Sequence, residues 1–384
     1  MKILYSHRSA GKTYGGALVD LLRVLERLNR QSFEPIVLLS HGDFHTGLFD
    51  RIGIKTIHLH LPPWRKGKSL PRIPFAIYRL ISLLKHEDID LVHLNDADDI
   101  ATVGIACKWV GIPCVVHARS EMEPRKFKKL WVHRADQVIA VSEAVRQAAV
   151  LGGISLERIR VIHSGIELSF FSEVTEALRI RNQYGFEDRV VIGTVANLSP
   201  IKGPDLFLEA MSLVCRERPE VVGLWVGADD HRIQEGLEHR AKELGIGGRL
   251  VFTGFQLDVW PYLSAMDLFV LPSLEEGFGL VLLEAMSLAK PVVATCTAGA
   301  AEIVDDGKTG LLVSLADTEA LAEAIMLLVK NTPQRKAMGE AGRQRVKENF
   351  SLERQIHEWE SVYSLLLRSG AKGTNKIVEG SYPE

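Results

Sequence analysis

A loop rich in glycine and acidic residues, placed between a strand pattern and a helix pattern, is the part of the sequence best suited to chemistry. It runs from Leu271 to Met286 and reads Leu-Pro-Ser-Leu-Glu-Glu-Gly-Phe-Gly-Leu-Val-Leu-Leu-Glu-Ala-Met. The helix is expected to begin near Leu280, so its free N–H groups and the positive end of its dipole would bind an anion such as a phosphate.

Two carboxylates accompany this helix start, and their spacing suits a sugar nucleotide. Glu284 lies four residues into the expected helix, roughly 6 Å along its axis at 1.5 Å per residue, a reach that joins a phosphate to a ribose. Its carboxylate can accept hydrogen bonds from two neighbouring hydroxyls. Glu276 precedes the helix, where a sugar beyond the phosphates would lie. Both could instead be solvated charges, but the apolar neighbours of Glu284 make an unpaired charge there costly.

The elements that position this loop follow from an alternation of short Val- and Ile-rich runs with longer helical patterns, which predicts parallel sheets wrapped by helices. The series restarts in the second half of the chain, so two doubly wound units are predicted. The predicted strands are 2–6, 35–39, 89–94, 113–117, 137–141, 159–163, 189–195, 221–227, 249–253, 267–271 and 291–295, and the predicted helices include 15–30, 74–86, 98–110, 142–151, 317–331, 333–349 and 351–368.

We therefore predict an α/β protein with two Rossmann-like, doubly wound parallel-sheet domains that face each other across a cleft. The first is expected to span residues 1–168 and the second residues 169–350. A helix at 351–368 is expected to pack back towards the N-terminal domain, and 369–384 to form a loose tail. Open α/β units bind ligands beyond the carboxyl ends of their strands, so the site is expected between the domains.

Composition excludes several classes of protein. The 384 residues are 46% hydrophobic and 24% charged with a net charge of −2, which is typical of soluble folded proteins and lacks the basic excess of a nucleic-acid binder. The four cysteines form no CxxC, so neither a disulfide framework nor a zinc site is predicted. The first apolar run is too short for a secretion signal, so we expect a cytoplasmic protein.

The ordered motifs of the chain resemble the retaining, nucleotide-sugar-dependent glycosyltransferases of the GT-B fold, family 4. Glu276 and Glu284 match the E-x7-E signature of that family. The other matching segments are Gly15-Gly16, 115–120, 140–142, 164–167, Lys202-Gly203 and 299–304. The resemblance implies transfer of a hexose-type unit from a nucleoside diphosphate sugar, UDP-linked in preference to GDP-linked, to an acceptor hydroxyl. It also implies a place in cell-surface polysaccharide, lipopolysaccharide or glycolipid synthesis.

The resemblance further implies roles for single residues. The catalytic set is His117, Lys202 and Glu276: Lys202 would neutralise the leaving diphosphate, Glu276 would bind the transferred sugar, and His117 would lie beside that sugar. Glu284 would bind the ribose. His117 could instead be a structural histidine at a strand end, and Lys202 a surface lysine. The donor-binding set is Gly16, Asn197, Lys202, Gly277, Phe278, Gly279, Leu280, Val281 and Glu284.

One position departs from the family pattern. The family usually has an arginine where this chain has Asn197. An asparagine can donate a hydrogen bond but brings no charge. Either the phosphate site is weaker in this protein, or its second cation comes from elsewhere.

In the N-terminal half, Asn95, Asp96 and Arg119 are candidate acceptor contacts. The Asp96-Ala97-Asp98 triplet spells the metal-binding DxD of the other major glycosyltransferase fold, but helix capping explains it better. We expect no metal and no cofactor, because no cluster of His, Cys and carboxylates has metal-ligand spacing. Gly15 and Gly16 open the first long helix, where the resemblance places diphosphate and acceptor, although an ordinary tight turn needs the same residues.

One other motif fails, and two kinds of alternative function stay open. Gly11-Lys12-Thr13 suggests an ATP-binding P-loop, but that pattern requires a glycine at position 6, where this chain has serine. A nucleotide-sugar epimerase or a phosphorylase would share the fold. A two-lobed sugar-binding protein without catalysis is the remaining alternative.

Charge is unevenly divided along the chain, with +7 over residues 1–170 and −9 over 171–384. Residues 51–86 hold eight basic and no acidic side chains and include an amphipathic run at 74–84; a second basic cluster lies at 125–131. These features predict peripheral contact with an anionic membrane. Alternatively, the run at 74–84 packs on the domain's own sheet.

Overall fold

The computed structural model describes residues 1–8, 15–40, 45–64, 67–120, 122–168 and 174–373. The chain forms two compact units: unit 1 comprises Met1–His163 and Leu352–Glu384, and unit 2 comprises Ser164–Ser351. The change from one unit to the other therefore falls slightly before the boundary expected at residue 168.

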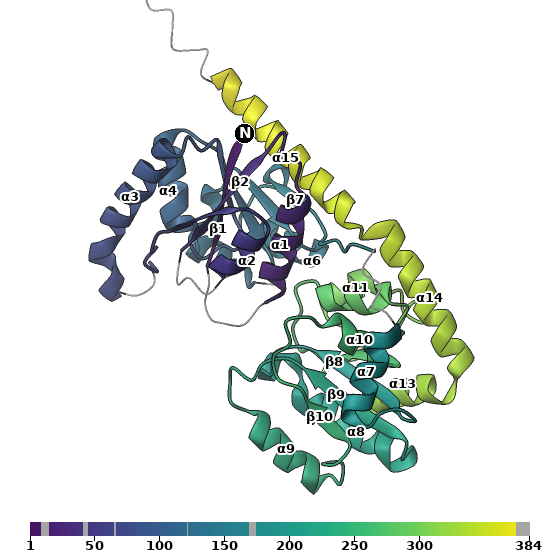
Figure 1. Cartoon of the computed structure of the whole chain (residues 1–384). Coiled ribbons are helices and arrows are strands. Elements are labelled where there is room, and N and C mark those ends of the chain that lie inside the picture. The colour runs from purple at the N-terminus through teal and green to yellow at the C-terminus, as the bar shows by residue number, and fades with distance from the viewer. Residues whose placement is uncertain (9–14, 41–44, 65–66, 121, 169–173, 374–384) are drawn as a thin grey trace, which may run out of the picture. The chain divides into compact units, whose positions relative to one another are not determined.

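Unit 1 contains a seven-stranded sheet in the order β3-β2-β1-β4-β5-β6-β7, with every pair parallel. Helices flank this sheet (Figure 1). The strands are β1 Lys2–His7, β2 Glu34–Leu39, β3 Lys55–His58, β4 Leu91–Leu94, β5 Cys114–Ala118, β6 Gln137–Ala140 and β7 Ile159–Val161. The α-helices of unit 1 are α1 Gly16–Arg27, α2 Thr46–Arg51, α3 Ile73–His86, α4 Ile100–Val110, α5 Pro124–Lys129, α6 Glu143–Leu151 and α15 Leu352–Gly373, with short 3₁₀ helices at Gly67–Arg72, Val132–Arg134 and Leu156–Arg158.

Unit 2 repeats the same design with a six-stranded sheet in the order β10-β9-β8-β11-β12-β13, again with every pair parallel. Its strands are β8 Val190–Val195, β9 Val221–Val226, β10 Leu250–Phe252, β11 Leu268–Leu271, β12 Val292–Thr295 and β13 Leu311–Val313. Its helices are α7 Val174–Tyr184, η4 Pro200–Lys202, α8 Pro204–Glu217, α9 Gln234–Glu243, α10 Trp260–Ala265, α11 Leu280–Ser287, α12 Ala298–Ile303, α13 Thr318–Lys330 and α14 Thr332–Asn349. The predicted fold class, two α/β domains with parallel sheets, is confirmed.

The sequence patterns missed one strand in each sheet, and both are edge strands. β3 reads Lys-Thr-Ile-His and has exposed residues at both ends. β13 has three residues. A strand paired on one side only needs no continuous apolar run, so its sequence signal is weak.

The last helix is longer than predicted. It was expected to end at 368, but α15 continues to Gly373, so the predicted tail starts inside the helix, and residues 374–384 lie outside the described residues. Gly370 did not stop it, because a single glycine costs a helix only about 1 kcal/mol. α15 packs beside α1 (Figure 1), and its Trp359 and Tyr363 belong to the apolar core of unit 1.

Among the described residues, no helix combines the length and the apolar character needed to cross a bilayer.

Unit 1 buries the imidazoles of His7, His93 and His117, and the last two pack against Trp359 of α15. The His93 ring packs at a tilt against Trp359 with 4.5 Å between ring centroids, and its Nδ1 lies 2.7 Å from the Tyr363 hydroxyl. Burial lowers the pKa of His7 to about 4 and holds the pKa values of His93 and His117 well below their usual value. All three rings are therefore neutral at pH 7.

We predict that unit 1 loses stability as the pH falls below about 6.5, before most carboxylates become protonated. The unfolded chain binds protons at these histidines near pH 6.5, whereas the folded chain does not, so stability falls as the pH drops from 6.5 towards 4. His7 alone accounts for about 3 kcal/mol at 1.36 kcal/mol per pKa unit. Asp96 acts in the opposite direction, because burial and the nearby Asp99 raise its pKa to about 6, but one carboxyl opposes three imidazoles.

Urea titrations at pH 7, 6 and 5 measure this effect. The variant His117→Leu removes one buried imidazole that has no hydrogen-bond partner among the described residues, so its stability should depend less on pH than that of the wild type. A wild-type midpoint that stays constant from pH 7 to 5 would contradict the prediction.

Candidate active site

Two loops meet at the carboxyl edge of the unit 2 sheet. One follows β8 and contains Lys202; the other follows β11 and contains Pro272. Gly203 has a positive φ of +67°, and a Cβ added there would lie 2.0 Å from the Pro272 carbonyl oxygen. A side chain at position 203 would therefore force the two loops apart, and glycine lets them touch.

This contact brings two opposite charges together. The Lys202 ammonium lies 2.6 Å from Glu276 Oε2, and the Leu274 N–H donates to the Ile201 carbonyl at 2.8 Å. The side chains of Lys202 and Glu276 keep 27% and 17% of their surface exposed. A cation and a carboxylate thus lie side by side at a strand edge, within reach of solvent and of a ligand.

The start of α11 is fixed by a second close approach. A Cβ added at Gly299 of α12 would lie 2.6 Å from the Phe278 backbone, and the Gly299 N–H donates to the Glu276 carbonyl at 3.3 Å. The Phe278 ring packs edge-on against Phe350, 5.9 Å between centroids. Gly279 then takes a φ of +103° as the N-cap, and α11 begins at Leu280 as the sequence predicts. The backbone of residues 277–281 is thereby held at the edge that carries Glu276.

Glu284 and Asn197 complete the part of the site in unit 2. Glu284 is in α11 and only 6% exposed. Asn197 follows β8, and its Oδ1 accepts a hydrogen bond from the Ala228 N–H at 3.2 Å. Asn197 therefore joins the ends of β8 and β9, a structural use that its sequence position did not reveal.

At the carboxyl edge of the unit 1 sheet, His117 is the penultimate residue of β5, one residue before the strand end where the sequence pattern places it. Its side chain is fully buried. Its ring packs against His93 and Trp359, with centroid distances of 5.8 and 5.3 Å. Arg119, two residues later, is the first residue beyond β5.

Arg119 joins a network of buried polar groups. Its guanidinium donates to Asp20 Oδ2 at 2.6 Å and to Asn95 Oδ1 at 2.7 Å. Gln355 of α15 donates to the same aspartate at 3.0 Å. Sequence reasoning missed Asp20 and Gln355, although Asp20 interrupts the apolar stripe formed in α1 by residues such as Leu21.

Gly15 and Gly16 start α1 with space around them. Gly15 is the N-cap and Gly16 the first helical residue. A Cβ added at either glycine would meet no described atom within 4 Å. Packing against the described residues therefore does not require glycine there, in contrast to Gly203.

The Asp96-Ala97-Asp98 triplet does not cap α4. The helix begins at Ile100 with Asp99 as its N-cap, and the Asp99 side chain makes no capping hydrogen bond. Asp96 instead accepts from the Asp98 N–H at 2.9 Å in a local turn, because an aspartate bonds readily to the backbone two residues on. The capping prediction is therefore wrong in this detail.

A cavity of about 230 Å³ lies beside this turn. Trp64 forms one wall; its indole N–H donates to Thr102 at 2.7 Å and its ring packs 5.0 Å from the Trp131 centroid. The Arg8 guanidinium on another side pairs with Asp99 at 2.6 Å. The lining residues are Arg8, Pro63, Trp64, Asp98, Ala101, Lys129 and Leu130.

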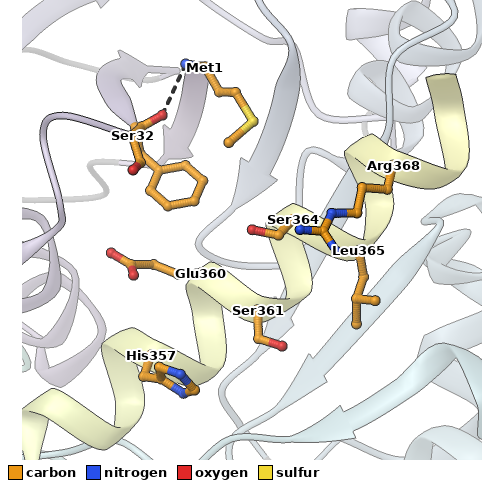
Figure 2. Close-up of a pocket in the computed structure, with 9 residues that line it drawn as sticks. Met1, Ser32, His357, Glu360, Ser361, Ser364, Leu365 and Arg368 are labelled. Carbon is orange, nitrogen blue, oxygen red and sulfur yellow. Dashed lines mark hydrogen bonds between the residues drawn. The ribbon is translucent and has the colours of Figure 1, made fainter.

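A larger pocket of about 450 Å³ lies at the opposite edge of unit 1, where β1 begins (Figure 2). Most of its labelled side chains project from α15, among them Glu360 and Ser364. The Met1 ammonium donates to the Ser32 carbonyl at 3.0 Å, and Glu360 accepts from the Asn29 N–H. Because ligands of open α/β sheets bind at carboxyl edges, this pocket is not the candidate active site.

Within the described segments, no group of three or more His, Cys, Asp or Glu side chains could hold a metal ion.

Two family models match the chain. Residues 14–170 match glycosyltransferase family 4, and residues 177–345 match glycosyl transferases group 1. The chain is 32% identical over 245 residues to the lipopolysaccharide core biosynthesis mannosyltransferase LpcC of Rhizobium leguminosarum bv. viciae, covering 63% of this chain and 68% of the relative. The chain belongs to the group 1 glycosyltransferases. The predicted family and enzyme class are confirmed.

Further comparisons place this glycosyltransferase among GT-B proteins. It is 29% identical over 295 residues to the GDP-mannose-dependent alpha-(1-6)-phosphatidylinositol monomannoside mannosyltransferase of Mycolicibacterium smegmatis, covering 72% of this chain and 77% of the relative. The chain is 25% identical in sequence to the protein in the crystal structure of Anabaena Alr3699/HepE in complex with UDP and glucose. The two structures match with a TM-score of 0.84, covering 95% of this chain and 99% of that chain.

The close contact at Gly203 leads to a stability prediction. The substitution Gly203→Ala should destabilise unit 2 of the glycosyltransferase by roughly 1–3 kcal/mol, because the new methyl group overlaps the Pro272 carbonyl and the backbone keeps a positive φ. Gly236→Ala in α9 is the matched control: nothing lies within 4 Å of an added Cβ there, so it should be neutral or stabilising. Thermal unfolding of both variants tests this, and equal midpoints would contradict it.

Proposed function

We propose that this glycosyltransferase moves a sugar from a nucleoside diphosphate sugar, UDP-linked, to an acceptor hydroxyl with retention of the anomeric configuration. The observation that carries the proposal is the contact of Lys202 with Glu276 next to the N-terminus of α11, at 2.6 Å. It sets a cation and backbone N–H groups where a diphosphate would lie, and a carboxylate where the transferred sugar would lie.

Donor binding would exchange partners within this group. Without donor, Lys202 and Glu276 neutralise each other. With donor, the ammonium would move to the diphosphate and the carboxylate to the sugar hydroxyls, while Glu284 would accept from the ribose hydroxyls. The charge that builds on the leaving diphosphate is then met by Lys202 and by the first turn of α11, and we propose that transfer needs no metal.

The chemical step follows from the absence of an evident nucleophile among the predicted site residues. The acceptor oxygen bonds to the anomeric carbon on the face from which the diphosphate departs, as the bond between carbon and phosphate oxygen breaks. The acceptor proton passes to an oxygen of the leaving phosphate. Retention results without a covalent enzyme intermediate.

The support for UDP is a likeness to the Anabaena protein, whose structure holds UDP and glucose. The mycobacterial relative uses GDP-mannose, so GDP-mannose is the competing donor to test. Sequence likeness to a lipopolysaccharide core enzyme supports a role in cell-surface polysaccharide, lipopolysaccharide or glycolipid synthesis.

We propose that the acceptor binds at the carboxyl edge of unit 1, with one sugar ring in the 230 Å³ cavity. An aromatic wall such as Trp64 can pack against the C–H face of a sugar. Asp98 and the cations Arg8 and Lys129 surround that wall, and charged groups of both signs can bond to hydroxyls, which donate and accept. Asp96 lies in the same turn.

The proposed function predicts product formation from a mixture of donor and acceptor oligosaccharides in the presence of EDTA. UDP-glucose, UDP-galactose and GDP-mannose are compared as donors, release of UDP or GDP is measured, and the anomeric configuration of the product is read by NMR. An inverted linkage, or activity abolished by EDTA and restored by Mg²⁺, would contradict the mechanism. Donor binding without turnover would favour the sugar-binding alternative, and isomerisation of the donor the epimerase.

Two variants separate the roles of the carboxylates. Glu284→Ala should weaken binding of the free nucleoside diphosphate at least tenfold, because its partner is the ribose. Glu276→Gln should leave that affinity within a few-fold and lower kcat, because its partner is the sugar. Unchanged diphosphate affinity in Glu284→Ala would remove the ribose assignment.

We also propose that the face formed by the 3₁₀ helix Gly67–Arg72 and α3 contacts an anionic membrane. One side of α3, including Ile73 and Leu80, is buried, and α3 packs beside α4 (Figure 1). These buried residues are explained by the alternative, in which the helix packs on its own domain. It does not explain Phe75 and Tyr78, which are 64% and 69% exposed. Their neighbour Arg79 lies 5.9 Å from the Phe75 ring.

Aromatic side chains beside cations suit the interface of a membrane with anionic lipids, where each cation contributes about 1 kcal/mol. Lys66 and the side chain of Lys68, also in the predicted basic stretch, lie outside the described residues. We expect the protein to cosediment with vesicles of mixed phosphatidylglycerol and phosphatidylcholine, and salt to weaken the binding.

The variant Phe75→Ser with Tyr78→Ser should lose most of this binding. Leu327→Ser, which removes a 47% exposed leucine from α13 in unit 2, is the matched control and should bind like the wild type. No cosedimentation at low salt, or equal loss in both variants, would leave a soluble acceptor as the better interpretation.

A further inference from the structure

We infer that Arg119 is a positioning residue: through Asp20 and Asn95 it fixes the carboxyl edge of unit 1 and the first turn of α1, with Gln355 of the C-terminal helix completing the arrangement. The inference rests on the proposed function, in which this edge receives the acceptor. It replaces the expectation that Asn95 and Arg119 touch the acceptor directly.

The guanidinium of Arg119 is occupied within the protein. Nη1 donates to Asp20 Oδ2 at 2.6 Å, Nη2 donates to Asn95 Oδ1 at 2.7 Å, and Nε bonds both the carbonyl and Oδ1 of Asn95 at 3.1 and 3.0 Å. Only 11% of the side chain is exposed. All three nitrogens are therefore committed, and the rigid fork of the guanidinium sets the angle between its two partners.

Asn95 passes this constraint to two further elements. It is fully buried, and its Nδ2 donates to the Ala17 carbonyl and to His7 Nδ1, each at 3.1 Å. Burial keeps His7 neutral by lowering its pKa to about 4, so its Nδ1 can accept. The ends of β1, β4 and β5 are thus tied to Ala17, in the turn that follows Gly15 and Gly16.

The other side of the network reaches α15. Gln355 Nε2 donates to both oxygens of Asp20, at 3.0 and 3.1 Å, and each of these two residues is 1% exposed. Gln355 lies on the helix face that includes the buried Leu352, Ile356 and Trp359. An apolar residue would pack there without desolvating a polar group.

The physical reason for the inference is the cost of this arrangement. A buried ion pair seldom stabilises a protein more than apolar residues of similar volume, because desolvation offsets the attraction. A buried pair that bonds to strand ends and to a helix start does fix geometry, and displacement of an active site by about 1 Å can slow a reaction about a hundredfold. The buried pair would therefore increase the turnover of the enzyme and not its stability.

Removal of both charges separates an effect on turnover from an effect on stability. Arg119→Met alone leaves Asp20 buried without its cation and should lower the thermal midpoint. Asp20→Asn combined with Arg119→Met removes the unpaired charge and should restore most of that midpoint, while kcat for transfer stays at least tenfold below the wild type. UDP affinity, which depends on unit 2, should change less than twofold.

Three single variants sharpen the result. Arg119→Lys keeps the charge without the fork and should recover only part of kcat. Gln355→Leu should lower kcat with little change in the midpoint. Arg160→Met, at an exposed position of β7, is the matched control and should behave as the wild type.

Two outcomes would overturn the inference. One is a double variant with kcat within twofold of the wild type. The other is unchanged kcat with a raised KM for the acceptor, which would make Arg119 a direct substrate contact. If the wild type transfers no sugar at all, the proposed function fails, and amide hydrogen exchange still tests the network: the double variant should lose protection at residues 17–21 while β2 stays protected, and unchanged protection would refute it.

Discussion

All strands of both sheets run parallel, and this constraint determines where the chemistry of the protein can lie. Parallel strands are buried on both faces by helices, so the polar groups of a central strand reach a ligand only at the strand ends and in the loops that follow them. The carboxyl ends of the strands and the N-termini of the helices that follow them meet at one edge of each sheet. Lys202 and Glu276, distant in sequence, are neighbours because β8 and β11 are neighbours in the sheet.

The two units use their edges in different ways. In unit 2, glycines permit close contact between backbones: Gly203 lets one loop touch Pro272, and Gly299 lets a helix touch Phe278. Backbone contact places a cation, a carboxylate and a helix start within one small region. In unit 1, buried side chains do the corresponding work, since Arg119 and Asn95 span the strand ends through hydrogen bonds. The first design supports the proposed backbone recognition of a diphosphate, and the second supports the proposed binding of an acceptor at the edge of unit 1.

The C-terminal helix belongs to unit 1 although unit 2 lies between them in the chain. α15 contributes Trp359 and Tyr363 to the core around His93, and Gln355 to the pair formed by Asp20 and Arg119. A chain shortened before this helix would therefore lose both a large apolar contact and the support of a buried carboxylate. Burial around the helix also explains why nearby imidazoles stay neutral.

The sequence by itself determined the fold class, the family and the start of α11, because long apolar runs and glycine-flanked acidic motifs are local signals. It also indicated that Glu276 lies in the loop before α11 and that Glu284 lies in α11 itself. The sequence patterns did not predict the edge strands β3 and β13, because strands paired on one side lack such runs. Only the tertiary structure decided that His117 lies in the core, that Asn197 bonds Ala228, and that Asp20 meets Gln355. These pairings join residues far apart in the chain, and they depend on which strands and helices pack together.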